Sequence, residues 1–263
     1  MKPKKILLIV LSVIFALALS SCGSSDTAFE KHTIAYPKDY DTTSSGASSY
    51  DGCDDHFNSN YYKQLDVYNM KSSDSLTVIS KFETYQQTTE YTCGSCAALM
   101  VMNYYDKYDP NKYDELSIAK LSNTSKTAGV GPSGIYKFFK NIGWNVQRDK
   151  AGKYTFDYNN NENATTDFTK WVVKNMKADI PIMVDWIDWG GHWQTIIGYD
   201  TMGTDDVFGD DVIIMADSYD TSDHYQDGYY TVGAERFFYM WAESSSLTGS
   251  PDPQPWVIAT PSK

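Results

Sequence analysis

The sequence is short of positive charge and of long apolar runs. It holds 22 Lys and Arg residues against 34 Asp and Glu residues, a formal net charge of −12 at pH 7. Proteins that bind nucleic acid present basic surfaces to the phosphates, so nucleic acid is an unexpected partner. The longest apolar run, residues 6–19, falls short of the ~20 residues that a membrane-spanning helix needs. We therefore expect no transmembrane helix.

That apolar run belongs to a leader. Lys2, Lys4 and Lys5 precede it, and Leu-Ser-Ser-Cys follows it, ending at Cys22. This order predicts a signal peptide over residues 1–21. Its end resembles the lipobox of bacterial lipoproteins, which implies cleavage before Cys22 and a lipid on its sulfur. We expect an extracytoplasmic protein anchored by lipid to the bacterial cell membrane; an ordinary secretory signal or an uncleaved anchor is the alternative.

The remaining chain is long enough for one sizeable domain with flexible ends. Residues 22–74 are rich in Ser, Asp, Thr and Gly without apolar periodicity, which predicts a flexible tether. Order is expected to begin near Ser75 and to continue over residues 75–243. Residues 244–263 read as a Pro- and Ser-containing tail.

Helices are expected in the first half of the domain and strands in the second. The first predicted helix, starting at Cys93, is apolar on nearly every face, which is typical of a helix buried at the centre of a domain. The second half holds short apolar runs separated by turn residues. This order predicts an α+β fold. The further predicted helices are 114–122, 134–141 and 167–176, and the predicted strands are 76–79, 180–186, 192–199 and 212–216.

Cysteine is scarce, and its placement is informative. Once Cys22 carries the lipid, Cys53, Cys93 and Cys96 remain, so at least one thiol stays unpaired within the chain. Cys93 lies at the predicted start of the apolar helix, where the positive helix end favours thiolate over thiol. It is therefore a candidate nucleophile, although a buried cysteine is more often only a small apolar residue.

A glutamine six positions earlier strengthens that candidate. A thiolate that attacks a carbonyl builds negative charge on oxygen, and its own backbone N–H together with the amide of Gln87 could stabilise that charge. This segment resembles the bacteriocin-processing, double-glycine family of cysteine peptidases in the papain superfamily, from which it departs at Ser95, usually proline, and at the additional Cys96. The residues that carry the resemblance are Gln87, Tyr91-Thr92-Cys93-Gly94, Ala97-Ala98-Leu99 and Tyr104-Tyr105. It implies a papain-like fold with the cysteine on a central helix and His and Asp on the sheet.

A base and an orienting acid complete the expected site. Of four histidines, His192 stands at the mouth of a predicted strand in a GHxxxxxGYD pattern that resembles the family's histidine strand. Asp217 follows the next strand and matches the family's Asp or Asn position, with Asp200 and Asp185 as fallbacks. The other histidines lie in polar or tether segments: His32, His56 and His224.

Several alternatives stay open. Cys96 could be the nucleophile, but Glu90 then occupies the oxyanion position and would repel the charge; Cys96 could also pair with Cys53. CGSC could be a redox motif, although no buried strand leads into it. The chain could also bind peptide or glycan without turnover, with tryptophans forming a groove wall: Trp186, Trp189 and Trp193.

Together, these features predict an exported cysteine peptidase with peptide or protein substrates. Cys93, His192, Asp217 and Gln87 would carry the chemistry, and neither metal nor organic cofactor is needed. The acidic turn at 205–211 could hold Ca²⁺, but a solvated hairpin turn is the better interpretation. The family's best-known members trim leader peptides while fused to an exporter. Transporter spans and a nucleotide-binding loop are missing here, so leader processing does not carry over.

Overall fold

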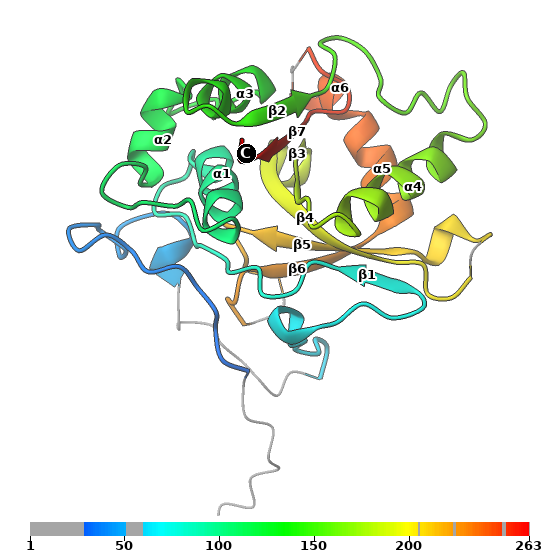
Figure 1. Ribbon diagram of the computed structural model, residues 1–263, viewed down its shortest axis with the longest axis horizontal. Helices are drawn as coiled ribbons and strands as arrows, with labels where there is room; N and C mark the ends of the chain where they lie inside the picture. Colours follow the sequence, from blue (N-terminus) through cyan, green and yellow to red (C-terminus); the bar gives the residue numbers. More distant parts are fainter. Residues whose placement is uncertain (1–28, 51–59, 205, 223–224, 249–250, 263) are drawn as a thin grey trace, which may run out of the picture.

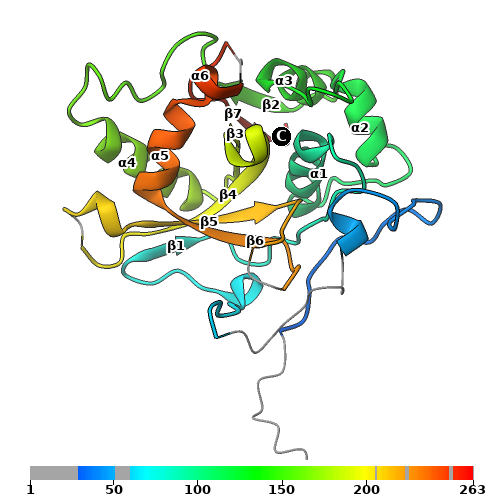
Figure 2. The same ribbon diagram turned by 180° about the vertical axis from the view of Figure 1, so that it is seen from behind.

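A computed structural model describes residues 29–50, 60–204, 206–222, 225–248 and 251–262. Two groups of helices lie at opposite ends of a curved antiparallel sheet (Figures 1 and 2). One group contains α1 (Cys93–Tyr104), α2 (Glu115–Leu121) and α3 (Pro132–Asn141); the other contains α4 (Ala164–Met176), α5 (Ala234–Ala242) and α6 (Ser244–Thr248). None of the helices in the described part of the chain is long and apolar enough to cross a bilayer.

The sheet is antiparallel throughout and has the order β2-β7-β3-β4-β5-β6. β1 also pairs with β4, on Gly198 to Asp200, beyond the stretch of β4 that β3 occupies. The strands are β1 (Leu76–Val78), β2 (Asn145–Arg148), β3 (Ile182–Trp186), β4 (His192–Asp200), β5 (Val212–Asp217), β6 (Tyr229–Gly233) and β7 (Trp256–Thr260). The predicted α+β class, helix-rich first and strand-rich second, is confirmed.

The helix that begins at Cys93 lies in the centre, as its composition predicts. Its first ten residues, 93–102, are all buried, because α1 contacts α2, α3, β3 and β4 on different sides. Gly94 permits the close approach of the sheet: a Cβ there would lie 2.5 Å from Val130 and 3.1 Å from the Trp193 ring. The sheet therefore sits directly against the first turn of α1.

Strand register brings four polar or aromatic side chains to one face of the sheet. His192 and Gln194 are two residues apart on β4, so both side chains point to the same face. Trp186 of β3 pairs with His192, and Asp217 of β5 pairs with Gln194. Paired residues share a face, so these four side chains lie together near the first residue of β4.

The tether prediction is wrong for the parts of residues 22–74 that the structure describes, 29–50 and 60–74. Ile34, Ala47 and Val67 are buried, and short 3₁₀ helices form at Ala47–Tyr50 and Val67–Asn69. The segment forms hydrogen bonds with residues 84–90 instead of forming an apolar periodic element. Order therefore begins well before Ser75. Hydropathy patterning does not detect packing of this kind.

The tail prediction is also wrong for much of residues 244–263. Residues 256–260 form β7, which lies between β2 and β3 inside the sheet. Val257 and Ala259 are fully buried. The run Trp-Val-Ile-Ala-Thr has the composition of a strand, but the Pro-rich stretch before it obscures this signal. The C-terminal strand is thus part of the core.

Candidate active site

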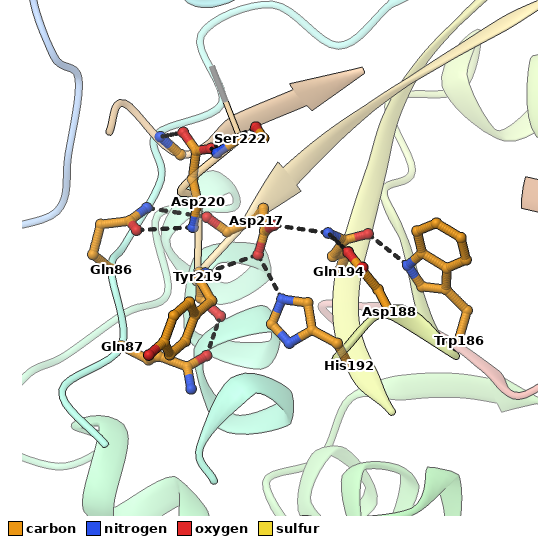
Figure 3. Close-up of polar contacts among 12 residues, drawn as sticks. Gln86, Gln87, Trp186, Asp188, His192, Gln194, Asp217, Tyr219, Asp220 and Ser222 are labelled. Atoms are coloured by element: carbon orange, nitrogen blue, oxygen red, sulfur yellow. Dashed lines mark hydrogen bonds and ion pairs between the residues drawn. The ribbon is translucent and has the colours of Figure 1, made fainter. Parts of the chain in front are cut away.

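The two residues predicted as base and orienting acid are in direct contact. His192 Nε2 lies 2.6 Å from Asp217 Oδ1, and both side chains are almost fully buried (Figure 3). His192 begins β4 and Asp217 ends β5, so the pair bridges two adjacent strands. With Nε2 engaged by the carboxylate, Nδ1 is the imidazole nitrogen left for another partner.

The Cys93 thiol lies near this imidazole. Cys93 is the first residue of α1 and is 7% exposed, and its thiol is close enough to His192 to help raise the pKa of the imidazole. The helix N-terminus adds a positive partial charge beside the sulfur. The structure therefore places these three candidate residues near one another.

The electrostatics of the pair favour an imidazolium facing a carboxylate. Burial alone would lower the pKa of His192, but Asp217 and Cys93 outweigh it and hold that pKa well above its usual value. Burial would raise the pKa of Asp217, yet the His192 charge and several hydrogen bonds keep it below its usual value. Both groups are thus held in their charged forms.

Gln194 is a further residue of this cluster that the sequence analysis missed. Its Nε2 donates to Asp217 Oδ2 at 2.7 Å, and its Oε1 accepts from Trp186 Nε1 at 2.6 Å. An indole nitrogen can only donate, which fixes the orientation of the amide. The backbone N–H of Tyr219 donates to Asp217 Oδ1 at 2.8 Å. These bonds orient the carboxylate, and the spacing of two between His192 and Gln194 was the available signal.

Gln87, the predicted oxyanion donor, is buried on the loop that leads into α1. Its Nε2 donates to the carbonyl of Thr89 at 2.7 Å, and its Oε1 accepts from Ser218 Oγ at 2.8 Å. A carbonyl only accepts, so Nε2 is assigned without ambiguity. Since an amide nitrogen carries two hydrogens, one remains for a further acceptor. In Figure 3, Gln87 lies among the residues drawn around His192 and Asp217.

The neighbouring Gln86, which the sequence analysis did not single out, joins this loop to the end of β5. Its Nε2 donates to the carbonyl of Asp217 at 3.1 Å, and its Oε1 accepts from the Asp220 N–H at 3.2 Å. The Gln87 N–H donates to the Ser218 carbonyl at 2.8 Å. The loop that carries Gln87 and the turn that carries Asp217 therefore form one hydrogen-bonded unit.

Cys96 is placed differently from Cys93. It is a free thiol with no exposed surface, one helical turn further along α1. Burial, with a smaller contribution from the nearby Glu115, raises its pKa well above the usual value. Cys93, not Cys96, faces the imidazole, which favours Cys93 as nucleophile. Cys53 and Cys22 lie outside the described residues.

The groove-wall prediction is wrong for two of the three tryptophans. Trp186 and Trp193 are buried in the core. Trp193 Nε1 donates to the Val130 carbonyl at 2.7 Å, and Trp186 packs edge-on against Phe237 of α5. The Trp189 side chain lies outside the described part of the structure. An indole with an internal acceptor and an aromatic neighbour is fully accommodated in a core.

The remaining candidates take other roles or lie elsewhere. His32 stacks on Tyr68, whereas His56 and His224 fall outside the described residues. Asp200 accepts from the Met202 N–H in a turn. Asp185 is half-buried; its burial raises its pKa to about 7, with His192 opposing the shift. Within the described ranges, no three His, Cys, Asp or Glu side chains are grouped to hold a metal.

The chain is similar to several known proteins. The family model described as the Peptidase_C39 like family matches residues 79–248. The peptidase domain of Streptococcus ComA, a bi-functional ABC transporter involved in a quorum-sensing pathway, is 17% identical. That match has a TM-score of 0.42 and covers 69% of this chain and 99% of that one. The same domain from Streptococcus mutans gives 17% identity, a TM-score of 0.37, and 68% and 98% coverage.

A fragment of prointerpain A from Prevotella intermedia is 11% identical, with a TM-score of 0.41 and coverage of 75% of this chain and 76% of that one. No curated protein matches significantly.

Proposed function

This chain belongs to the Peptidase_C39 like family, and we propose that it is a cysteine peptidase that hydrolyses peptide or amide bonds by acyl transfer. The observation that carries the proposal is the position of His192, which contacts Asp217 at 2.6 Å and lies close enough to the Cys93 thiol for that thiol to help raise its pKa. A nucleophile, a base and an orienting acid in this arrangement activate a thiol for attack on a carbonyl carbon.

In the first half of the reaction, the Cys93 thiolate attacks the carbonyl carbon and a sulfur–carbon bond forms. His192, held as an imidazolium by Asp217, gives its proton to the departing amine as the carbon–nitrogen bond breaks. The product is a thioester on Cys93 and a free amine. Neutral His192 then takes a proton from water, which attacks the thioester, and the acid product leaves as the thiolate re-forms.

Gln87 and the Cys93 backbone N–H stabilise the oxyanion of each step. The Thr89 carbonyl and the Ser218 hydroxyl hold the Gln87 amide in one orientation, so little reorganisation is needed when charge appears. Removing one such donor typically costs 10²–10³ in kcat. A cysteine peptidase of this kind needs no metal or organic cofactor.

The site is proposed to act outside the cytoplasm. The basis is the leader at residues 1–21 and the lipobox-like ending at Cys22. A lipid on Cys22 would hold the peptidase at the bacterial cell membrane, where it would meet extracytoplasmic peptides or proteins. Expression with Cys22→Ala tests this: the wild type should partition with membranes and the variant should not. Equal partitioning would contradict the anchor.

Peptide cleavage tests the catalytic proposal. The purified protein is incubated with a peptide mixture, and new termini are identified by mass spectrometry. Cys93→Ala should abolish cleavage, whereas Cys96→Ala, the same change one turn along α1, should leave cleavage detectable. Cleavage that survives Cys93→Ala would overturn the assignment.

Thiol reactivity provides a second measurement that needs no substrate. Iodoacetamide at mildly acidic pH should label Cys93 faster than Cys96, as located by peptide mapping, because Cys93 begins α1 near His192 whereas Cys96 has no exposed surface. Reversible oxidation that requires both Cys93 and Cys96 would instead indicate redox chemistry. Absence of both cleavage and fast labelling would indicate a binding protein.

A further inference from the structure

A buried carboxylate lies against residues 85–92, the loop that carries Gln87 and leads to Cys93. Glu115, the first residue of α2, has no exposed surface. It accepts hydrogen bonds from the Tyr85 hydroxyl at 3.0 Å, from the Thr88 N–H at 3.0 Å, from the Thr88 hydroxyl at 2.8 Å and from the Thr92 hydroxyl at 2.5 Å. All these donors come from residues 85–92, the segment that carries Gln87 and ends at Cys93.

The cost of burying this group indicates that the contacts matter. A carboxylate in a protein interior costs several kcal/mol unless it is paired or fully hydrogen-bonded. None of the side chains bonded to Glu115 is a cation. Both oxygens are instead occupied by donors from a single loop, so the loop and the carboxylate satisfy each other. Displacing one leaves the other with buried, unpaired polar groups.

Thr92 shows what this arrangement does at the start of the helix. Threonine before a helix usually turns its oxygen to the first N–H groups as a cap. Thr92 occupies the N-cap position of α1, but its side chain makes no such bond and turns to Glu115 instead. The N-terminal N–H groups beside Cys93 therefore have no competition from that hydroxyl.

We infer that Glu115 is a positioning residue for the proposed reaction. It fixes Thr88 and Thr92, and so sets the Gln87 amide and the Cys93 N–H at the distance and angle that an oxyanion requires. Thr88 directly follows Gln87, and Thr92 directly precedes Cys93, so each anchored residue is covalently next to one oxyanion donor. This role rests on the proposed peptidase function.

A purely structural role, anchoring α2, is the competing explanation. Asp114 provides the control because it precedes Glu115 and caps the same helix through the Ser117 N–H at 2.7 Å. Asp114→Ala weakens α2 but removes none of the hydrogen bonds between Glu115 and residues 85–92. Helix anchoring alone predicts similar effects on turnover from Asp114→Ala and Glu115→Gln at equal loss of stability.

The test compares kcat, KM and the Cys93 alkylation rate in wild type, Glu115→Gln and Asp114→Ala on a peptide that the wild type cleaves. For Glu115→Gln we expect kcat to fall at least 10-fold while KM and alkylation stay within about 3-fold, since alkylation creates no oxyanion. Asp114→Ala should keep wild-type kcat where it is folded. Thr92→Val keeps the shape, removes the hydroxyl and should lower kcat in the same way.

The outcomes separate the two proposals. Wild-type kcat in folded Glu115→Gln or in Thr92→Val overturns the positioning role and leaves the peptidase intact. Equal losses of kcat in Asp114→Ala and Glu115→Gln also overturn it. A wild type that neither cleaves peptides nor alkylates rapidly at Cys93 overturns the peptidase proposal, and the positioning role with it.

Discussion

Gly46 links the N-terminal segment to residues 87–90, the loop that carries Gln87, and its replacement is a sharp test of that contact. It adopts a left-handed backbone, with φ of +70°. A Cβ at this position would lie 2.4 Å from the Gln87 carbonyl oxygen, 2.5 Å from the Thr88 carbonyl carbon and 2.6 Å from the Thr89 nitrogen. These are backbone atoms that no rotamer change can move. Gly46→Ala must therefore separate the segment from the loop.

The expected loss of stability has two parts. The left-handed backbone costs about 1–2 kcal/mol for alanine. Separation also stretches three hydrogen bonds, from the Gly46 N–H to Glu90 at 2.8 Å, from the Ser48 N–H to Gln87 at 3.1 Å and from the Ser45 hydroxyl to Thr88 at 3.0 Å. At about 1 kcal/mol each, the total loss is about 4–5 kcal/mol.

Gly143→Ala is the matched control. Gly143 has φ of +84° just after α3, and nothing lies within 4 Å of the added carbon. This variant should lose only the backbone part, about 1–2 kcal/mol. Urea denaturation gives both free energies of unfolding, and peptide cleavage gives kcat. We expect kcat to fall at least 10-fold in Gly46→Ala alone. Equal stability and equal kcat in the two variants would refute the reasoning.

Three further predictions concern charge and the core. Asp217→Asn should be less stable than wild type, and the difference should be largest between about pH 4 and 6.5, where both partners are charged. The difference should shrink as the pH falls through the lowered pKa of Asp217 or rises through the raised pKa of His192. Asp185→Asn should gain stability relative to wild type as pH rises from about 4 to about 7, because ionising this carboxyl is disfavoured only in the folded protein; a flat difference across pH-dependent denaturation would contradict this. Val257→Asp buries an unpaired charge inside β7 and should abolish the native circular dichroism spectrum, whereas Thr260→Asp at the strand end should fold.

Local sequence patterns predicted helices and strands correctly where the apolar pattern of the segment matches its burial in the structure. The apolar run after Cys93 predicted a central helix because all its faces are covered, and α1 is that helix. The run at 212–216 predicted β5 because alternation is lost in a strand covered on both sides. β7 was missed because its five residues follow a proline-rich stretch, and its place between β2 and β3 depends on pairing far along the chain.

The residue types indicated the candidate catalytic groups, but they did not indicate the residues that hold those groups in place. Cys93, His192 and Asp217 each stand at an element boundary with a chemical reason to be there. Glu115 has no chemical signal in the sequence, and Gln194 has only its spacing of two from His192. Their roles depend on register and on a contact between residues 27 positions apart. Sequence reasoning proposes reactive groups, but which polar residues orient them follows only from the packed structure.

The two adjacent glutamines explain why the site is held as one piece. Gln86 turns to the backbone of residues 217–220, while Gln87 is fixed by the Ser218 hydroxyl from the same turn. A displacement of the β5 end therefore moves Asp217 and Gln87 together. The relative position of the Asp217 carboxylate and the Gln87 amide, on which the proposed acyl transfer depends, is thus preserved by a shared support rather than by two independent ones.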